Sequence, residues 1–325
     1  MLEQTDRKET GMLKRIGSLY GLGEVNMIRR LDAGNFNDSF LVSNSDDMRY
    51  IVRTSHDIVP QLEESLGIQD TLHRQGCSVA RPRTSTNDRY SESLEDGDGR
   101  RITVSILDYW DGVTHRIIEK ESISVDAFHA IGQHLARLHQ ALSEIDTDDV
   151  KLNKWFDSDN CFSCFDREHK NLEKDSCLLN TYLECQDRCK NKYSAAHIIH
   201  SDIHFDNILL CGSDVCFCDF DDMCLGDHRM DVALLLFDLA IVNDPPGDWN
   251  AINRYATSII DGYNKARGQR TLAISDLLDC FELLDLSFCI LFRECELDGI
   301  EDGWVKRYLL DRDERIVNDK PFWRA

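Results

Sequence analysis

The hydrophobic pattern of the chain changes near Trp110 from a strand-like alternation to a helical period, and this change limits the possible folds more than any other feature. Before that point, short apolar segments are separated by turn residues such as Asp32-Ala33-Gly34-Asn35, which is typical of an antiparallel sheet. The predicted strands are residues 27–32, 39–43, 49–53 and 102–109.

Helical spacing dominates the rest of the chain. One helix, over residues 59–75, is expected within the first region. Later, residues 124–142 carry apolar side chains every three or four positions, and nearly everything after residue 231 has the same period. A strand-rich first third followed by a helix-rich remainder predicts an α+β chain with two lobes, over residues 1–108 and 109–325.

The chain is strongly acidic. It has 325 residues, and its 37 Lys and Arg against 59 Asp and Glu give a formal charge of −22. This charge disfavours a nucleic acid or an anionic membrane as the main partner, because both would repel the chain. The first residues lack the apolar core of a secretory signal, and the most apolar segment, Val232–Val242, is too short to span a bilayer. We therefore expect a cytoplasmic protein without a nucleic-acid or membrane partner.

The chain contains 13 cysteines, most of them inside apolar runs, where Cys behaves as a small core residue. In the cytoplasm they are expected to remain thiols. One cluster allows a second interpretation, because Cys161 and Cys164 form a C-x-x-C motif that is followed by Cys177, Cys185 and Cys189. The later cysteines lack the paired spacing of a structural zinc site, so free thiols are favoured and zinc remains the alternative.

The segment 197–231 carries the clearest chemical pattern. Apolar strands alternate there with polar loops, and a hairpin predicted over residues 208–218 separates two polar clusters. Asp202 and Asn207 precede the hairpin, and Asp219 follows it. Oxygen ligands from the two ends of a hairpin can meet on a divalent cation, and Mg²⁺ suits a site of one or two protein oxygens, water and phosphate.

Three motifs follow one another in and just beyond this segment. They are His200-Ser201-Asp202-Ile203-His204-Phe205-Asp206-Asn207, Asp219-Phe220-Asp221-Asp222 and Gly226-Asp227-His228-Arg229-Met230-Asp231-Val232-Ala233. In order and spacing they resemble the H-x-D-x-x-x-x-N loop, the metal-binding Asp and the G-D-x-x-x-D-L-A segment of the aminoglycoside phosphotransferase and choline kinase superfamily. Residues 131–139 also match the L-A-x-L-H helix of that family. The resemblance covers roughly residues 25–310 and is weakest over 145–195.

The resemblance implies a bilobal protein-kinase-like fold, with an N-terminal antiparallel sheet lobe that binds nucleotide and a mostly helical C-terminal lobe. It also implies roles in Mg²⁺-dependent phosphoryl transfer from ATP. Asp202 would orient the acceptor hydroxyl and take its proton, while Asn207 and Asp219 would hold Mg²⁺ on the phosphates. His200 would support the loop. Asp231 would anchor the loop backbone, with N-capping of the following helix as the alternative.

Three further carboxylates lie close to these motifs in the sequence. Each of Asp221, Asp222 and Asp227 is compatible with contact to metal or substrate and equally with a solvated acidic loop. Their roles stay open at this point.

The resemblance places the nucleotide phosphates beside the first predicted strands. Gly34 permits close backbone approach in the loop that would cover the phosphates, and Asn37 or Ser39 could donate to phosphate oxygens, with an ordinary hairpin turn as the alternative. Arg53 stands where the family normally has a lysine, and its planar fork can hold phosphate in a bidentate way. Glu64, chosen over its neighbour in the same helix, is its expected partner.

Residues 106–110 resemble the hinge of the family. The backbone of Leu107 and Tyr109 is expected to bind adenine there, whereas the aromatic side chains of this segment are more simply explained as core.

The implied activity is transfer of the γ-phosphoryl group of ATP to a hydroxyl of a small molecule, such as an aminoglycoside, an amino alcohol or a hydroxy amino acid. The negative charge of the chain favours a cationic acceptor. A protein Ser/Thr kinase is the first alternative, disfavoured because no A-P-E-like anchor follows Asp219. A nucleotide-binding pseudokinase is the second; Arg53 supports it, whereas the presence of Asp202 and Asn207 opposes it.

Overall fold

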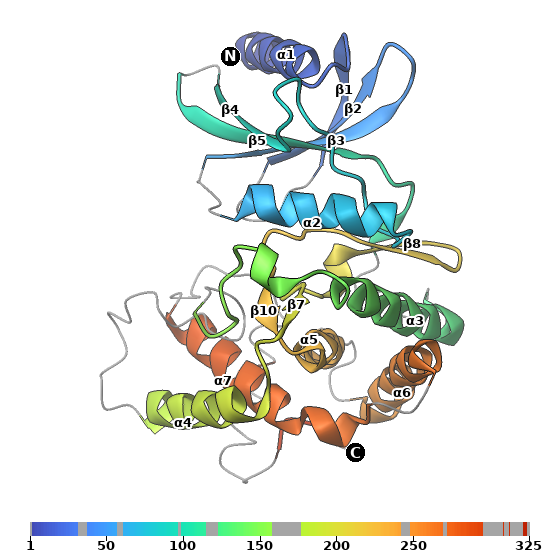
Figure 1. The fold of residues 1–325 in the computed structure, drawn as a ribbon, viewed down its shortest axis with the longest axis vertical. Coiled ribbons are helices and arrows are strands. Elements are labelled where there is room, and N and C mark those ends of the chain that lie inside the picture. Colours follow the sequence, from blue (N-terminus) through green and yellow to red (C-terminus); the bar gives the residue numbers. More distant parts are fainter. Residues whose placement is uncertain are drawn as a thin grey trace. The chain divides into compact units, whose positions relative to one another are not determined.

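The computed structural model describes residues 2–31, 38–56, 61–96, 99–114, 123–157, 177–241, 248–268, 272–294, 308, 312 and 321–323, with backbone only for 2–10, 177 and 292–294. The chain divides into two compact units, Met1–Asp111 and Gly112–Ala325 (Figure 1). Among the described residues, no helix combines the length and apolar character needed to cross a membrane.

Unit 1 is built on a five-stranded antiparallel sheet in the order β1-β2-β3-β5-β4. Its strands are β1 (Val25–Leu31), β2 (Asp38–Asn44), β3 (Arg49–Ser55), β4 (Ser91–Glu95) and β5 (Arg101–Asp108). Four of them match the predicted strands. The fifth, β4, was not predicted, because its sequence SESLE lacks the alternation of apolar residues that indicates a half-buried strand.

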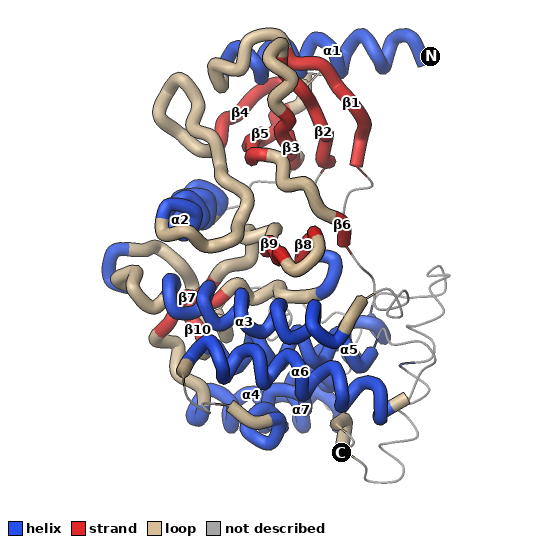
Figure 2. Tube along the Cα trace, turned by 90° about the vertical axis from the view of Figure 1, so that its right-hand side faces the viewer, coloured by secondary structure: helices blue, strands red, loops and turns tan. Residues whose placement is uncertain are grey.

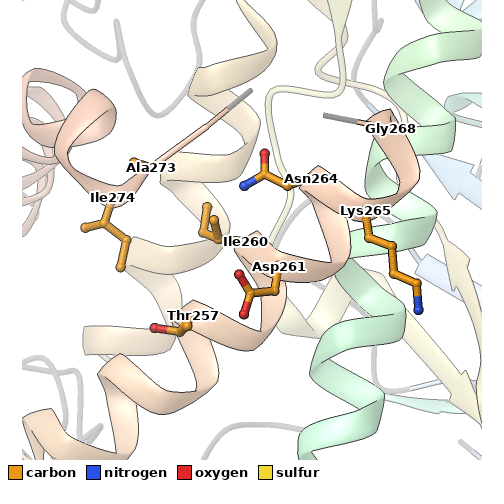
Figure 3. Close-up of a pocket in the computed structure, with 8 residues that line it drawn as sticks. All are labelled: Thr257, Ile260, Asp261, Asn264, Lys265, Gly268, Ala273 and Ile274. Atoms are coloured by element: carbon orange, nitrogen blue, oxygen red, sulfur yellow. The ribbon is translucent and has the colours of Figure 1, made fainter. Parts of the chain in front are cut away.

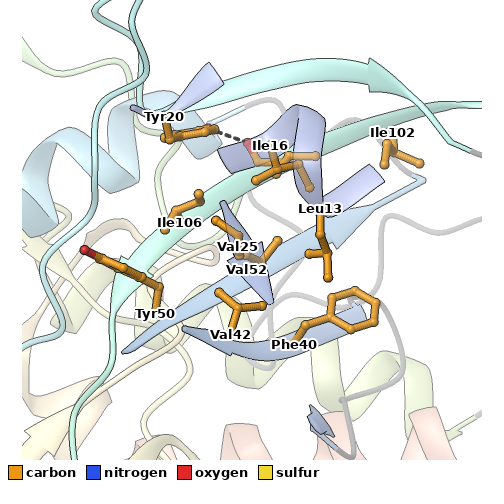
Figure 4. Packing of buried hydrophobic residues seen from close by; sticks show 11 residues of the cluster. Leu13, Ile16, Tyr20, Val25, Phe40, Val42, Tyr50, Val52, Ile102 and Ile106 are labelled. Carbon is orange, nitrogen blue, oxygen red and sulfur yellow. Dashed lines mark hydrogen bonds between the residues drawn. The ribbon is translucent and has the colours of Figure 1, made fainter. Parts of the chain in front are cut away.

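Helix α1 (Leu2–Leu19) covers one face of this sheet. Leu13 and Ile16 are buried in a cluster with apolar side chains of the strands (Figure 4). Tyr20, just after the helix, donates its hydroxyl to the Val104 carbonyl at 2.9 Å. This helix was not predicted, because its N-terminal half is polar and only its last turns carry apolar residues at helical spacing.

Helix α2 (Leu62–Arg74) belongs to the same unit and lies on the other side of the sheet from α1 (Figure 1). It matches the predicted helix over 59–75. Gly76, with φ of 83°, follows its last turn in the left-handed conformation that favours glycine.

Unit 2 is mostly helical (Figure 2). Its α-helices are α3 (Val125–Leu142), α4 (Cys177–Lys192), α5 (His228–Ile241), α6 (Trp249–Arg267) and α7 (Leu278–Glu294), and its 3₁₀ turns are η2 (Thr147–Asp149), η3 (Phe205–Asn207) and η4 (Ile274–Leu277). Two small sheets complete the unit: β6 (Val113–Thr114) with β8 (Ile208–Cys211) and β9 (Asp214–Phe217), and β7 (His197–Ile199) with β10 (Cys224–Gly226). The α+β architecture, with a sheet lobe and a helical lobe, is therefore confirmed.

Helices α3 and α6 run side by side at very close range (Figure 2). A Cβ at Gly132 would come within 1.9 Å of the Ile259 carbonyl oxygen, and one at Gly262 within 2.0 Å of the His129 oxygen. Only glycine permits this approach at the two positions. The contact fixes α3, which carries His139 near its end.

Helix α5 lies at the centre of the packing of unit 2, and most of its side chains are buried. Its sequence HRMDVALLLFDLAI is apolar nearly all round, as expected of a core helix. Two carboxylates interrupt it, Asp231 and Asp238. Because a carboxylate away from water needs hydrogen-bond donors, the partners of these two residues indicate what the helix holds in place.

Candidate active site

The segment between β7 and β8, called the 200–207 loop here, is anchored by Asp231. One oxygen of this fully buried carboxylate accepts the His200 amide at 2.9 Å, and the other accepts the Ser201 amide at 2.8 Å. His139 Nε2 donates to Asp231 at 3.1 Å, and the Tyr263 hydroxyl lies 2.9 Å from His139 Nδ1. Burial lowers the pKa of His139 to about 3, so the ring is neutral and can donate at Nε2 while accepting at Nδ1.

Burial also raises the pKa of Asp231, and the His200 and Ser201 amides oppose that rise. The carboxylate thus exchanges water for three fixed donors. Loss of this side chain would leave two backbone amides of the 200–207 loop without their acceptor.

The ring of His200 connects the loop to the end of the hairpin. Its Nε2 donates to the Cys218 carbonyl at 3.0 Å, and the Asp202 amide donates to its Nδ1 at 3.3 Å. Burial lowers the pKa of His200, which agrees with a neutral ring in this tautomer. Both nitrogens are used by backbone groups, so the ring positions Asp202 next to Cys218, the residue before Asp219.

Asp202 and Asn207 are in direct contact. The Asn207 side-chain amide donates to both the Asp202 carbonyl and Asp202 Oδ2, each at 2.9 Å. The Asn207 carbonyl in turn accepts the Cys218 amide at 3.0 Å. With its nitrogen bonded to Asp202, Asn207 keeps an amide oxygen of the kind that a divalent cation prefers, and the backbone pairing brings the residue close to the start of the acidic segment at Asp219.

Two residues at this site have left-handed backbone conformations that non-glycine residues rarely adopt. Ser201, just before Asp202, has φ of 70°, and Asp219 has φ of 64°. Such conformations cost free energy and persist only where surrounding contacts impose them. Here the bond from Ser201 to Asp231 is one such contact. The strained positions are the residue before Asp202, the expected base, and Asp219, the expected metal ligand.

The comparison with family models identifies the chain. Residues 27–268 match the model of the phosphotransferase enzyme family. The chain belongs to this family. It is therefore related to enzymes that transfer phosphoryl groups to hydroxyl groups of small molecules, as the motifs at residues 200–207 and 219–222 predicted. No curated protein sequence matches the chain.

Solved structures with the same fold support this assignment. An amicoumacin kinase, in complex with AMP-PNP and Ca²⁺, superimposes with a TM-score of 0.72 at 17% identity, over 99% of this chain and 97% of its own. A microcompartment-associated aminopropanol kinase gives 0.66 at 16% identity, over 95% and 98%. Choline kinase LicA from Streptococcus pneumoniae gives 0.57 at 13% identity, over 97% and 98%. ATP and a divalent metal, the predicted cofactors, are expected for this family.

In this phosphotransferase, His204 is a charged neighbour of Asp202 to which the sequence analysis gave no role. Its Nε2 lies 3.5 Å from Asp202 Oδ2. Burial lowers the pKa of His204, but contact with Asp202 and the charges of Asp238 and Asp206 outweigh burial and raise the pKa to about 9. The ring is therefore an imidazolium at neutral pH, within a group of three carboxylates.

Asp227, one of the carboxylates whose role was open, forms an ion pair with Arg229. The guanidinium donates to its two oxygens at 2.8 and 2.7 Å, and the arginine also lies 4.6 Å from the centre of the Tyr193 ring. These contacts hold the pKa of Asp227 below its usual range despite its burial. The pair supports the turn before α5.

In unit 1, three of the expected nucleotide residues, Ser39, Arg53 and Leu107, lie on the sheet. Ser39 and Arg53 are cross-strand partners, and Arg53 is paired with Ser105 on its other side. Ser105 is paired with Ser91 in turn. Ser39, Arg53, Ser105 and Ser91 therefore form a row across the sheet, and directly paired residues share one face. At the end of the row, Glu63 accepts the Ser91 amide at 2.8 Å and its hydroxyl at 2.6 Å.

The bonds of Glu63 thus connect α2 to β4. Glu64, the next residue of α2, stays the predicted partner of Arg53. At the expected hinge, the Tyr109 amide donates to the Arg49 carbonyl at 3.2 Å, and Leu107 lies within β5. Gly34 and Asn37 lie outside the described residues.

Among the described residues, no group of three or more His, Cys, Asp and Glu side chains is arranged to hold a metal ion. Mg²⁺ needs no such cage, because it takes one or two protein oxygens and completes its shell with water and phosphate. Asn207 and Asp219 fit that requirement.

Of the cysteine cluster, Cys161 and Cys164 lie outside the described residues, as does the side chain of Cys177. Cys185 and Cys189 are buried free thiols that face the Asp279 carbonyl at 3.9 and 3.6 Å.

A cavity of about 710 Å³ lies on the surface of α6, away from the residues described above (Figure 3). Thr257, Asp261 and Lys265 line it along the helix, and Ile274 closes it from η4. None of the predicted site residues contributes to it.

Proposed function

We propose that this phosphotransferase moves the γ-phosphoryl group of ATP to a hydroxyl of a small, amine-bearing molecule in a Mg²⁺-dependent reaction. The observation that carries the proposal is the position of Asp202. Its carboxylate is one-third exposed, bonded to Asn207, and held by a loop whose backbone is fixed through Asp231. A fixed, solvent-accessible carboxylate is what a positioned general base requires.

Asp202 would accept the proton of the acceptor hydroxyl. At the same time the oxygen of that hydroxyl would form a bond to the γ-phosphorus, and the bond between this phosphorus and the leaving ADP oxygen would break. His200 cannot take this proton, because its two nitrogens are engaged by Asp202 and Cys218 backbone groups. Asn207 and Asp219 would hold Mg²⁺, which when bound neutralises charge on the phosphate oxygens.

The preference for an amine-bearing acceptor is supported by charge. Asp202, Asp206 and Asp238 surround a single imidazolium in the described part of unit 2, and the chain as a whole has a charge of −22. Such surroundings attract a cation. Two of the structural neighbours are described as kinases of aminopropanol and choline, which are amino alcohols.

The experiment is a screen of amino alcohols, amino sugars and hydroxy amino acids for acceptor-dependent ADP release. With an acceptor in hand, Asp202→Asn is expected to lower kcat by about 10²–10⁴-fold while ATP and Mg²⁺ still raise the melting temperature. Asp219→Ala is expected to lose the Mg²⁺-dependent part of that thermal shift. Asp261→Asn, an exposed carboxylate of the cavity on α6, is the matched control and should behave as wild type.

Wild-type turnover in Asp202→Asn would show the base assignment to be wrong. A thermal shift with ATP but no ADP release with any acceptor would favour the pseudokinase alternative. ADP release that depends on protein substrates alone would favour a protein kinase.

A further inference from the structure

Helix α5 presents a second carboxylate to the 200–207 loop. Asp238 lies seven residues after Asp231, so the two side chains project from nearly the same face of the helix, two turns apart. Asp231 holds the loop at its start. Asp238 Oδ2 accepts the amide of Phe205 at 3.0 Å, in the second half of the loop.

Phe205 begins the η3 turn that carries Asn207. The residue before the turn, His204, makes no side-chain capping bond, so the turn receives its acceptor from a distant element. The Phe205 side chain is almost fully buried and packs edge-on against Phe128 of α3, with 5.9 Å between ring centres. Backbone and side chain of Phe205 are therefore both fixed, one by α5 and the other by α3.

The same carboxylate also interacts with the charged ring beside the general base. His204 carries a positive charge 3.5 Å from Asp202 Oδ2, and Asp238 is one of the negative groups that stabilise this charge. Burial raises the pKa of Asp238 itself to about 6, against the opposing effect of His204 and the Phe205 amide. A carboxylate that costs free energy to keep in the middle of an apolar helix is expected to have a specific use.

We propose that Asp238 is a positioning residue for phosphoryl transfer: its bond to the Phe205 amide sets the η3 turn, and the turn places Asn207 against Asp202. The inference rests on the proposed function, since the reaction it tunes is the transfer assigned to Asp202. Asp231 and Asp238 then act as two clamps from one helix, at the two ends of the 200–207 loop.

The test compares Asp238→Ala and Asp238→Asn. The alanine variant removes the acceptor, and a displacement of the reacting groups by about 1 Å is expected to lower kcat about 10²-fold. KM for ATP should change less than kcat, because Asp219, the other proposed Mg²⁺ ligand, lies outside the η3 turn that Asp238 sets. The asparagine variant keeps an oxygen that can accept the Phe205 amide, so it should retain kcat within about tenfold of wild type.

The matched control is Asp285→Ala in α7. Asp285 is also a carboxylate of a core helix in unit 2, but it accepts the Tyr308 hydroxyl at 2.7 Å and pairs with Arg312. Its loss should lower the melting temperature and leave kcat within about twofold. A kcat in Asp238→Ala that falls no more than in Asp285→Ala would overturn the proposal, as would Asp238→Asn as inactive as Asp238→Ala.

A measurement that does not depend on enzyme activity separates the proposed role of Asp238 from the proposed function. Hydrogen exchange of peptides that cover residues 200–210 should be faster in Asp238→Ala than in wild type, and unchanged in Asp285→Ala. If wild type released no ADP with any acceptor, the proposed function would fail, yet faster exchange would still support the clamp. Unchanged exchange in Asp238→Ala would overturn the clamp whatever the activity.

Discussion

Two charged networks of the phosphotransferase, one in each unit, differ in how far their partners are buried. In unit 1, Asp70 is nearly buried, but its arginine partners Arg74 and Arg81 have side chains 65% and 44% exposed. In unit 2, both members of the pair between His139 and Asp231 are completely buried. The arginine partners of Asp70 can turn to water when a contact is lost, whereas the partners of Asp231 cannot.

This difference bears on function because of what each network holds. The arginine network of unit 1 joins Asp70 and Arg74 within α2, whose backbone is already paired in the helix, and adds Arg81 from the segment that follows. The network around Asp231 holds backbone amides of a loop that has no strand partner at those positions. Substitutions in the network around Asp231 should therefore affect stability and catalysis together, whereas those in the arginine network around Asp70 should affect neither strongly.

The largest expected effect is that of Asp231→Ala. Two buried amides and His139 Nε2 would lose their acceptor, which we expect to lower the free energy of unfolding by about 1–3 kcal/mol for each donor left unsatisfied. Urea unfolding measures it. The control is Asp261→Ala, an exposed carboxylate of α6, with an expected change within about 0.5 kcal/mol. A loss below about 1 kcal/mol in Asp231→Ala would show that the buried network is not the stronger of the two.

The fold could be predicted where one local pattern determined an element. Ser124 caps α3 by accepting the Ala127 amide at 3.1 Å, and the apolar runs on either side of Gly212 form the β8–β9 hairpin. The strand β4 could not be predicted in this way. It is held by pairing with β5 and by bonds such as that from Ser91 to Glu63, which join residues far apart in the sequence.

The same distinction applies to the site. Asp202, Asn207 and Asp219 stand in motifs of fixed spacing, so the sequence alone predicted them as one group, and Asn207 does bond to Asp202. Asp238 was not predicted as a site residue, because its partner Phe205 is 33 positions away and the bond depends on how α5 packs. A carboxylate inside a predicted core helix, seven residues after a motif Asp, was the available signal.

A smaller effect is expected from pH. His139 and His228 stack with 4.2 Å between ring centres, and burial lowers the pKa of His139 to about 3 and of His228 to about 2. The unfolded rings have pKa values near 6.5. Between these values only the unfolded chain binds the protons, so stability falls as pH falls below about 6.5, by about 1–2 kcal/mol per ring at pH 5.

Thermal melts at pH 6.5 and pH 5.0 measure this effect. His228→Phe keeps a flat ring in the stack and removes the titration, and His228 Nε2 has no hydrogen-bond partner among the described residues that would be lost. The variant should lose less stability than wild type between the two pH values. The pKa of His204 is raised to about 9, so its contribution to stability is lost only as pH rises above 6.5. The two melts are therefore compared at pH values no higher than 6.5. Equal losses in wild type and variant would contradict the assignment.

The smallest effect is expected in unit 1, for Arg83→Gln. The arginine donates to both oxygens of Asp108 at 2.6 and 2.9 Å, but the two side chains are 34% and 32% exposed, so each can be solvated when the pair is lost. We expect a loss of about 0–1 kcal/mol, and 1 M salt should bring wild type toward the variant. Melting temperatures at low and high salt measure both. A salt-independent loss as large as that of Asp231→Ala would mean that exposure of the partners does not set the cost, and the contrast between the units would need another cause.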